Sequence, residues 1–259
     1  MISRKIVKTS YANIYAEPSF SSEMVTQALF FESLDIISQN GNWYRILQWD
    51  GYQGYVHKFY LCEEGDAQGN RVTLTDRTTP IYSSKERQDV SLLAPFGASL
   101  NCRDRSGEWI AFNLDSDSYY LKNPTESNIV PSRELVAEYC GRLIGSPYLW
   151  GGKTPLGYDC SGFVQAVYAA IGINLDRDTS KQIKEGSSTS IKLSDALPGD
   201  LVFFDIDGNG VDHVGIWIGD ERVAHCGGQV KVQSIHDDTH TRLIDHIIEI
   251  KSMGPHLNG

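Results

Sequence analysis

The sequence predicts an α+β fold in which two small β-barrels precede a domain of helices and strands. Short strands separated by turn residues fill roughly the first 125 residues, and Asn40-Gly41 is typical of an antiparallel hairpin turn. A weak repeat at a shift of about 66 residues relates Gly41-Asn42-Trp43 to Gly107-Glu108-Trp109. After residue 131, two helical patterns are followed by strands, which is the order of an α+β domain. We therefore expect domains at residues 1–66, 67–128 and 129–259.

The strands expected in the N-terminal half are short and alternate with polar turns. They cover Asn13–Tyr15, Ser33–Ile37, Trp43–Leu47, Gly54–Val56 and Phe59–Leu61. The length and strand number of each copy fit SH3-like barrels, and the copies resemble bacterial SH3-like domains. The first copy has the longer loop, at Asp50–Tyr55, so we expect any ligand contact there. Polar stretches at residues 65–70 and 122–131 are typical of linkers.

Two helices and four strands are expected in the C-terminal domain. Ser132 can cap a helix whose apolar residues recur at helical spacing, and Gly145 is placed to end it. A second helix is expected from about Cys160 to Ile171, with Gly172 as its stop. The expected strands are Leu201–Asp205, His213–Ile218, Arg222–Cys226 and Gln229–Ser234. Helices followed by these strands predict an antiparallel sheet with helices packed against it.

Composition and charge argue against several classes of protein. Of the 259 residues, 41% are hydrophobic and 22% charged, values that fit neither a disordered nor a fibrous chain. A net charge of -10 disfavours broad electrostatic binding to nucleic acid or to an anionic membrane. The apolar runs are far shorter than the roughly 20 residues of a membrane helix, and the start lacks the apolar run of a secretory leader. We expect a cytoplasmic protein that binds neither nucleic acid nor membrane.

Cys160 differs from the other four cysteines in its position. A Gly-rich loop leads into it, and it stands at the start of an expected helix. The N-terminus of a helix favours the thiolate, which is the nucleophilic form of cysteine. An odd number of cysteines without CxxC pairs fits a reducing compartment. We interpret Cys160 as a candidate nucleophile and the others as structural: Cys62, Cys102, Cys140 and Cys226.

A cysteine nucleophile needs a base, and two histidines lie on successive expected strands. If the hairpin pairs Trp217 with Glu221, His213 lies opposite His225, close enough for one imidazole to orient the other. A two-residue loop would instead shift the register by one. Cys160 and the two histidines could also hold zinc with one open position, although the chain lacks local ligand pairs. We favour the nucleophile over zinc and expect no metal or other cofactor.

Five segments resemble the NlpC-type cell-wall cysteine peptidases in both order and spacing. They are Gly145–Gly152, Asp159–Val164, Leu197–Phe204, Asp212–Ile216 and Val223–His225, within about residues 131–250. The resemblance implies a papain-like fold in which Cys160 attacks an amide carbonyl and His213 is the general base. It implies that His225 orients that imidazole. It also implies that the Tyr148 hydroxyl faces the reacting centre, where it and the Cys160 N–H can hold the oxyanion.

Two SH3-like domains ahead of such a peptidase resemble a particular subset of the family. That subset hydrolyses the γ-D-glutamyl–diamino acid bond of murein peptides that have a free N-terminal L-Ala, which would make a murein-derived peptide the substrate. In that subset, an acid and a tyrosine of the first SH3-like domain bind the substrate amine. Tyr52 matches the tyrosine, while Glu17 and Asp50 compete as the acid. The alternatives are a non-catalytic protein that binds wall fragments and a broader peptidoglycan hydrolase.

A further segment, Arg177-Asp178-Thr179-Ser180, resembles the part of the family that binds the dipeptide. Asp178 is expected to receive the substrate amine, while Arg177 and the two hydroxyls meet the α-carboxylate of D-Glu. Asp178 could also cap the following helix through Ser180. Asp159 and Ser161 match positions that help to hold the dipeptide. The sequence does not choose between diaminopimelate and lysine, nor does it give the oligomeric state.

Overall fold

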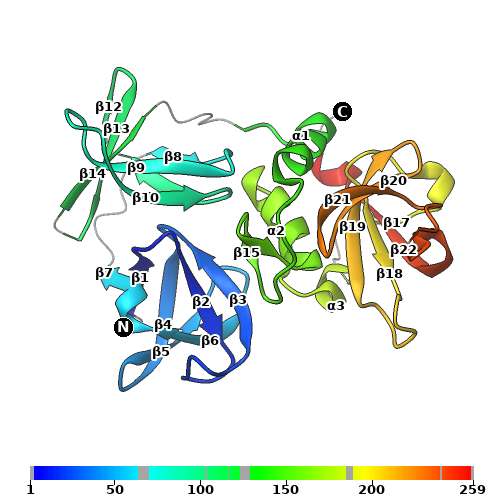
Figure 1. Ribbon diagram of the computed structural model, residues 1–259, viewed down its shortest axis with the longest axis horizontal. Helices are drawn as coiled ribbons and strands as arrows, with labels where there is room; N and C mark the ends of the chain where they lie inside the picture. The colour runs from blue at the N-terminus through cyan, green and yellow to red at the C-terminus, as the bar shows by residue number, and fades with distance from the viewer. Residues whose placement is uncertain are drawn as a thin grey trace. The chain divides into compact units, whose positions relative to one another are not determined.

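The chain folds into two compact units, Met1–Asn128 and Ile129–Gly259 (Figure 1). The computed structural model describes residues 3–63, 70–102, 104–115, 117–122, 129–184, 189–239 and 241–257. The linkers expected at 65–70 and 122–131 lie mostly outside these ranges. Within them, no helix is both long and apolar enough to cross a membrane.

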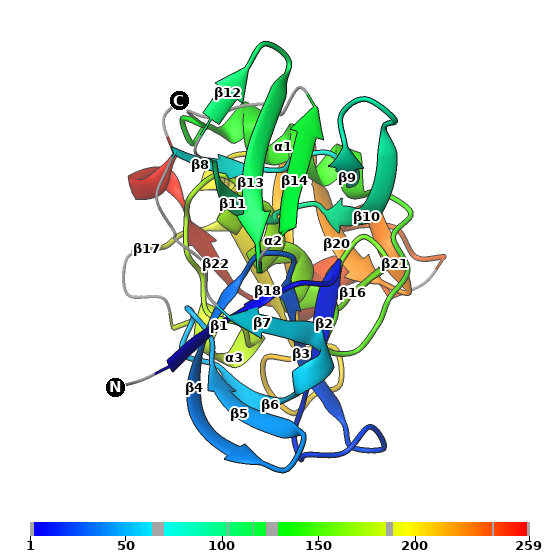
Figure 2. The same cartoon turned by 90° about the vertical axis from the view of Figure 1, so that its left-hand side faces the viewer.

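Seven strands near the N-terminus form one antiparallel sheet, ordered β3-β2-β6-β5-β4-β1-β7 (Figure 2). Their bounds are β1 (Ser3–Val7), β2 (Tyr11–Tyr15), β3 (Met24–Leu29), β4 (Ser33–Asn40), β5 (Trp43–Leu47), β6 (Gln53–His57) and β7 (Leu61–Glu63). Apolar side chains alternate along these strands and meet in a core built around Ile14, Leu34, Ile46 and Val56. The sequence pattern did not predict β1 and β3.

Phe59 and Tyr60 lie in a 3₁₀ turn, η1 (Lys58–Tyr60), and not in the expected strand. The His57 imidazole accepts the Phe59 N–H at 3.4 Å, which stabilises a turn where the apolar run alone favoured an extended chain. Only Leu61 of the expected strand is extended, at the start of β7.

The next strands form a five-stranded sheet, β10-β9-β14-β13-β12, and a two-stranded sheet, β11-β8. The bounds are β8 (Asn70–Thr73), β9 (Thr78–Ser84), β10 (Asp89–Pro95), β11 (Ser99–Cys102), β12 (Asp104–Ser106), β13 (Trp109–Leu114) and β14 (Asp117–Lys122). One apolar cluster joins Ile6 and Cys62 of the first sheet, and Phe30 from the turn after β3, to Val72 and Leu74. The strands before and after residue 66 therefore share part of one apolar cluster, while the boundary at residue 66 and the number of barrels stay predictions.

The C-terminal unit is built on a six-stranded antiparallel sheet, β17-β22-β18-β19-β20-β21. The strands are β17 (Thr189–Ser190), β18 (Leu201–Phe204), β19 (His213–Gly219), β20 (Arg222–Gly227), β21 (Gln229–Ser234) and β22 (Ile247–Ser252). Helices α1 (Arg133–Leu143) and α2 (Cys160–Ala170) lie on one side of it (Figure 1). The remaining elements are β15 (Lys153–Thr154), β16 (Gly157–Tyr158), α3 (Thr179–Gln182), η2 (Leu193–Asp195), η3 (Leu243–His246) and η4 (Gly254–His256).

The ends of both expected helices are confirmed. The Ser132 hydroxyl accepts the Leu135 N–H at 3.3 Å and caps α1. Gly145 and Gly172 follow α1 and α2 with φ of 84° and 83°, a backbone conformation that favours glycine. The four expected strands correspond to β18, β19, β20 and β21, whereas β17 and β22 were not expected.

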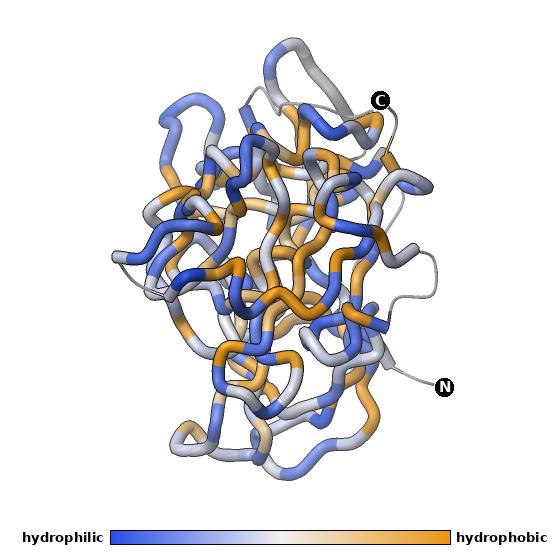
Figure 3. Tube along the Cα trace, turned by 90° about the vertical axis from the view of Figure 1, so that its right-hand side faces the viewer, coloured by the Kyte–Doolittle hydropathy of each residue, from blue (hydrophilic) through white to orange (hydrophobic). Residues whose placement is uncertain are grey.

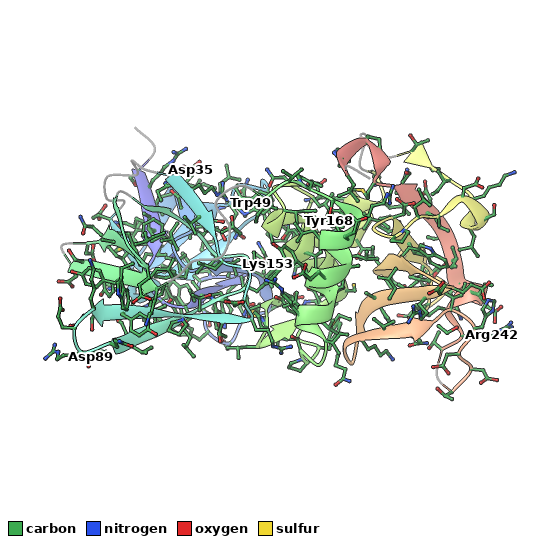
Figure 4. All side chains as sticks on the ribbon, turned by 90° about the horizontal axis from the view of Figure 1, so that it is seen from above. Asp35, Trp49, Asp89, Lys153, Tyr168 and Arg242 are labelled. Atoms are coloured by element: carbon green, nitrogen blue, oxygen red, sulfur yellow. The ribbon has the colours of Figure 1, made fainter. Side chains whose placement is uncertain are left out.

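The core of the C-terminal unit lies where α2 packs on the sheet. All four residues of β18 are buried, so both faces of this strand are covered, and apolar segments run through the interior in Figure 3. Tyr168, labelled in Figure 4, lies on α2 and donates its hydroxyl to the Gly199 carbonyl. A buried ion pair of 3.1 Å between Arg133 and Asp200 joins α1 to the start of β18. These contacts fix α2 against the sheet.

Candidate active site

The thiol of Cys160 lies at the first residue of α2, as expected. The Asp159 carboxylate precedes it and caps the helix, accepting the Gly162 N–H at 2.7 Å and the Gly151 N–H at 2.9 Å. Gly162 is required here, because a Cβ at this position would lie 2.1 Å from the Gly152 carbonyl oxygen. The Gly-rich loop thus packs directly against the first turn of α2. This packing leaves the thiol buried, with 8% of Cys160 exposed.

Two other segments meet at the thiol. The Thr179 hydroxyl of α3 lies 3.7 Å from the Cys160 Sγ, and the Asp212 carbonyl lies 3.9 Å from it. Asp212 comes directly before His213, and its carboxylate accepts the N–H groups of Ile206 and Asp207 at 2.9 and 2.7 Å. The start of β19 is therefore held beside the nucleophile.

His213 and His225 do meet, but not in the register first considered. Trp217 pairs with Val223 and not with Glu221, and Gly215 lies opposite His225. Asp220 and Glu221 form a two-residue turn with φ of 49° and 54°, and β19 has a bulge between Trp217 and Gly219, just before the turn. Together they move the register.

The two imidazoles contact each other along the diagonal of the hairpin. Nε2 of His213 lies 2.9 Å from Nδ1 of His225. A Cβ on Gly215 would lie 3.1 Å from the His225 Cβ and 2.4 Å from a Val223 methyl. The missing side chain at residue 215 therefore leaves the room in which the rings meet.

Both histidines are neutral at pH 7. Burial lowers the pKa of His213 to about 4, against an opposing effect of Asp212. Burial also lowers the pKa of His225 to about 3, and His213 and Lys231 lower it further. A neutral imidazole has one lone pair to accept a proton, so this pair is suited to general-base chemistry.

The pKa of Cys160 departs from the expectation based on its helix position. Burial, and then the Asp159 carboxylate, raise the pKa of the thiol, while the Thr179 hydroxyl and nearby backbone N–H groups lower it less. Desolvation of the charged form outweighs the favourable field of the helix end. The resting side chain is therefore a thiol, and it needs a base to become a nucleophile.

Tyr148 is held near the nucleophile by backbone contacts. Its N–H donates to the Gly228 carbonyl at 2.8 Å, and its backbone bridges to Tyr158. Burial, Cys160 and Asp159 raise the pKa of the Tyr148 hydroxyl to about 12. This hydroxyl keeps its proton and can donate a hydrogen bond to a developing oxyanion.

Arg177 is buried and engages Asp159 and Ser161. Its Nη1 donates to Asp159 Oδ1 at 3.0 Å and to Ser161 Oγ at 2.9 Å, and its Nη2 donates to Asp159 Oδ2 at 2.5 Å. These three residues, each expected to contact substrate, thus form one cluster beside the nucleophile. The two-point pairing with Asp159 gives Arg177 a structural function that sequence reasoning did not predict.

Asp178 does not cap α3 through its side chain, which corrects one of the two interpretations of this residue. Its carboxylate lies 3.6 Å from the Lys181 ammonium instead. Thr179 is half-buried beside Cys160, and Ser180 is exposed. Of this segment, the structure brings Arg177 and Thr179 to the nucleophile.

The residues expected to contribute from the N-terminal unit lie in two neighbouring loops. Tyr15 pairs with Tyr55, so the loop after β2 and the loop before β6 emerge at the same end of the sheet. Glu17 is exposed in the first loop, where its N–H donates to Ser22 Oγ at 3.0 Å. In the second loop Asp50 Oδ1 accepts the Tyr52 N–H at 3.0 Å. The structure therefore brings both candidate acids and the tyrosine to one edge of this unit.

Sequence reasoning missed Gln233, which touches the histidine pair. Its Oε1 lies 3.3 Å from Nε2 of His225. Val223 pairs with Gln233, and His225 with Lys231, so Gln233 is a diagonal neighbour of His225. The available signal was the position of Gln233, a polar residue in the expected strand Gln229–Ser234, which follows the strand of His225. Among the described residues, no group of three or more histidine, cysteine or acidic side chains is arranged to hold a metal ion.

Comparison with known proteins matches both parts of the chain. Residues 145–248 match the NlpC/P60 family, and residues 10–61 match the bacterial SH3 domain. This chain carries an NlpC/P60 domain behind a bacterial SH3 domain. The NlpC/P60 match contains Tyr148, Cys160, His213 and His225.

Relatives resemble the chain to different extents. The γ-D-glutamyl-L-lysine dipeptidyl-peptidase of Bacillus subtilis is 27% identical over 231 residues, covering 77% of this chain and 71% of that protein. The probable endopeptidase p60 of Listeria innocua is 44% identical over 103 residues, covering 39% of this chain and 21% of that protein. The chain thus corresponds to about a fifth of the Listeria protein. A crystal structure of an NlpC/P60 family protein from Bacillus cereus aligns over 99% of this chain and 100% of its own, with a TM-score of 0.85 and 19% identity, and supports the fold alone.

Proposed function

We propose that this protein is a cysteine endopeptidase that hydrolyses the γ-D-glutamyl–diamino acid bond of murein peptides with a free N-terminal L-Ala. The observation that carries the proposal is a thiol at the start of α2 beside a neutral, buried pair of histidines. The Bacillus subtilis relative, which aligns with 77% of this chain, is named as a γ-D-glutamyl-L-lysine dipeptidyl-peptidase, and lysine is a diamino acid. A place in cell-wall peptide recycling follows from this substrate, and a cytoplasmic location stays a prediction.

The reaction begins when Cys160 loses its proton to His213. Nε2 of His213 contacts His225, which leaves Nδ1 of His213 to take the proton as the S–H bond breaks. The thiolate then attacks the γ-carbonyl of D-Glu and forms a tetrahedral oxyanion. The Cys160 N–H and the Tyr148 hydroxyl can stabilise that charge.

Collapse of the intermediate completes the first half of the reaction. The C–N bond breaks, the diamino acid leaves as an amine with the proton from His213, and an acyl-enzyme remains on Cys160. Water then attacks the thioester with His213 again as the base, the C–S bond breaks, and the sulfur of Cys160 recovers a proton from His213. The products are L-Ala-D-Glu and the diamino acid portion of the peptide.

Acetylation of the substrate amine should lower kcat/KM by roughly a hundredfold, because an acidic pocket would lose its cation. The candidate acids are Asp178 in the C-terminal unit, with Glu17 and Asp50 in the N-terminal unit. The measurement compares L-Ala-γ-D-Glu-diaminopimelate and L-Ala-γ-D-Glu-L-Lys with their N-acetyl forms. Equal rates on free and acetylated peptides would support a broader peptidoglycan hydrolase, and no cleavage of any of them would support a non-catalytic wall-fragment binder.

The acid limb of kcat/KM should lie well below pH 6.5, close to pH 4. His213 must be neutral to act as a base, and burial lowers its pKa to about 4. Histidines of the unfolded chain take up protons near pH 6.5, so the folded protein loses stability as the pH falls from there toward 4. Circular dichroism at each pH therefore accompanies the rate measurements. An acid limb at pH 6 or above would contradict a pKa of about 4 for His213.

A further inference from the structure

Gln233 is buried on β21, 5% exposed, and contacts His225 of the histidine pair. Its side chain lies between two groups. Oε1 is 3.3 Å from Nε2 of His225, and Nε2 of Gln233 donates to the Thr241 carbonyl at 3.1 Å. A continuous chain of polar contacts therefore runs from Thr241 through Gln233 and His225 to His213.

The Thr241 carbonyl fixes the direction of the hydrogen bonds in this series of contacts. A carbonyl oxygen only accepts hydrogen bonds, so the NH₂ group of Gln233 must face it and Oε1 must face His225. With the amide turned around, two acceptor oxygens would meet at Thr241. The amide oxygen toward His225 then accepts a hydrogen bond, which requires the proton of His225 to be on Nε2.

The position of that proton decides the tautomer of the catalytic base. A neutral His225 with its proton on Nε2 has its lone pair on Nδ1, and this nitrogen lies 2.9 Å from Nε2 of His213. Nε2 of His213 must therefore carry a proton. Nδ1 of His213 is then the atom with the lone pair, and it can accept the proton of Cys160.

We propose that Gln233 is a positioning residue that fixes the proton on Nε2 of His225 and, through it, the base-competent tautomer of His213. The inference rests on the proposed function for its catalytic consequence, but the tautomers themselves do not depend on any substrate. Without Gln233, His225 could carry its proton on Nδ1 and donate it to His213, whose lone pair would then face His225.

Charged groups around the histidine pair also shift the pKa values of both imidazoles, and they affect any measurement made as a function of pH. Asp212 raises the pKa of His213, whereas Lys231 of β21 lowers the pKa of both histidines, and His213 also lowers the pKa of His225. Burial outweighs these effects in both cases. Replacement of Gln233 by glutamate would add a carboxylate to this set and favour protonation of the pair.

The test uses the full chain with ¹⁵N-labelled histidine and three variants. Gln233→Met keeps the volume but removes the acceptor, Gln233→Glu keeps an acceptor, and Gln165→Met is the control. Gln165 is also a buried glutamine that donates to a backbone carbonyl, that of Leu175, at 2.9 Å. Signals of His225 and His213 are assigned from His225→Gln and His213→Gln variants.

In the unmodified protein, the ¹⁵N shifts should show the proton on Nε2 of both histidines. Gln233→Met should move part of the His225 population to the form with its proton on Nδ1. It should also lower kcat by roughly tenfold to a hundredfold, with KM changed by less than about threefold. Gln233→Glu should restore the Nε2–H tautomer and much of kcat, and it should move the acid limb to higher pH. Gln165→Met should change neither the tautomers nor kcat.

Unchanged ¹⁵N shifts and kcat in Gln233→Met would overturn the inference, as would Nδ1 protonation of His225 in the unmodified protein. A loss of kcat with unchanged tautomers would also overturn it, because Gln233 would then act only through stability. Failure of the unmodified chain to cleave murein peptides would contradict the proposed function, and the ¹⁵N spectra would still decide the assignment of Gln233.

Discussion

Replacement of Cys160 by alanine should abolish hydrolysis of L-Ala-γ-D-Glu-diaminopimelate, with a fall in kcat of about 10⁴-fold or more. The acyl-enzyme needs a sulfur at the start of α2, and a water molecule held by His213 would be a far weaker nucleophile. The alanine side chain fits the same space, so circular dichroism and the melting temperature should remain close to those of the parent protein.

Cys140→Ala is the matched control for this result. Cys140 is buried in α1, and burial raises its pKa to about 12, so its thiol has no nucleophilic function. This variant should keep at least half of the parent kcat. Retention of a tenth or more of the parent turnover in Cys160→Ala would show that Cys160 is not the nucleophile.

Replacement of Arg177 by methionine should lower the free energy of unfolding of the C-terminal unit by about 3–5 kcal/mol. Arg177 is only 3% exposed, and its guanidinium makes a two-point pair with Asp159. Without it, the Asp159 carboxylate at the start of α2 is left without its cation. Urea unfolding followed by tryptophan fluorescence gives the change.

Two further variants separate the structural function of Arg177 from a function in substrate binding. Asp159→Asn combined with Arg177→Met should recover part of the lost stability, because it removes the uncompensated charge. Arg222→Met is the exposed control, since Arg222 pairs with Asp220 at 3.0 Å on the surface, and its loss should cost less than about 1 kcal/mol. If Arg177→Met raises KM but leaves unfolding unchanged, Arg177 serves the substrate alone.

The local parts of the site could be predicted from the sequence. The cap of α1, the glycines that end both helices, and the thiol at the start of α2 depend on residues within a few positions of each other. Short-range spacing carries that information. The same holds for the two histidines, because each lies on a strand with a clear apolar pattern.

The parts that sequence reasoning missed depend on contacts between distant segments. The first register considered was wrong and the two-residue loop kept as its alternative was formed, because the turn at Asp220 and the bulge before it are set by backbone geometry that residue type specifies weakly. The pairing of Arg177 with Asp159 joins residues 18 positions apart. The pKa of Cys160 was misjudged because burial of the thiol depends on how α3 and β19 pack around it.

The apolar cluster that joins Ile6, Phe30 and Cys62 to Val72 and Leu74 also determines how the N-terminal unit loses its structure. Repeats with separate cores can unfold independently, one after another. Here, unfolding of either set of strands would expose apolar side chains of the other set to water. The stabilities of the two sets of strands are therefore coupled through this shared cluster. A substitution in this cluster that destabilises one set of strands should therefore also destabilise the other.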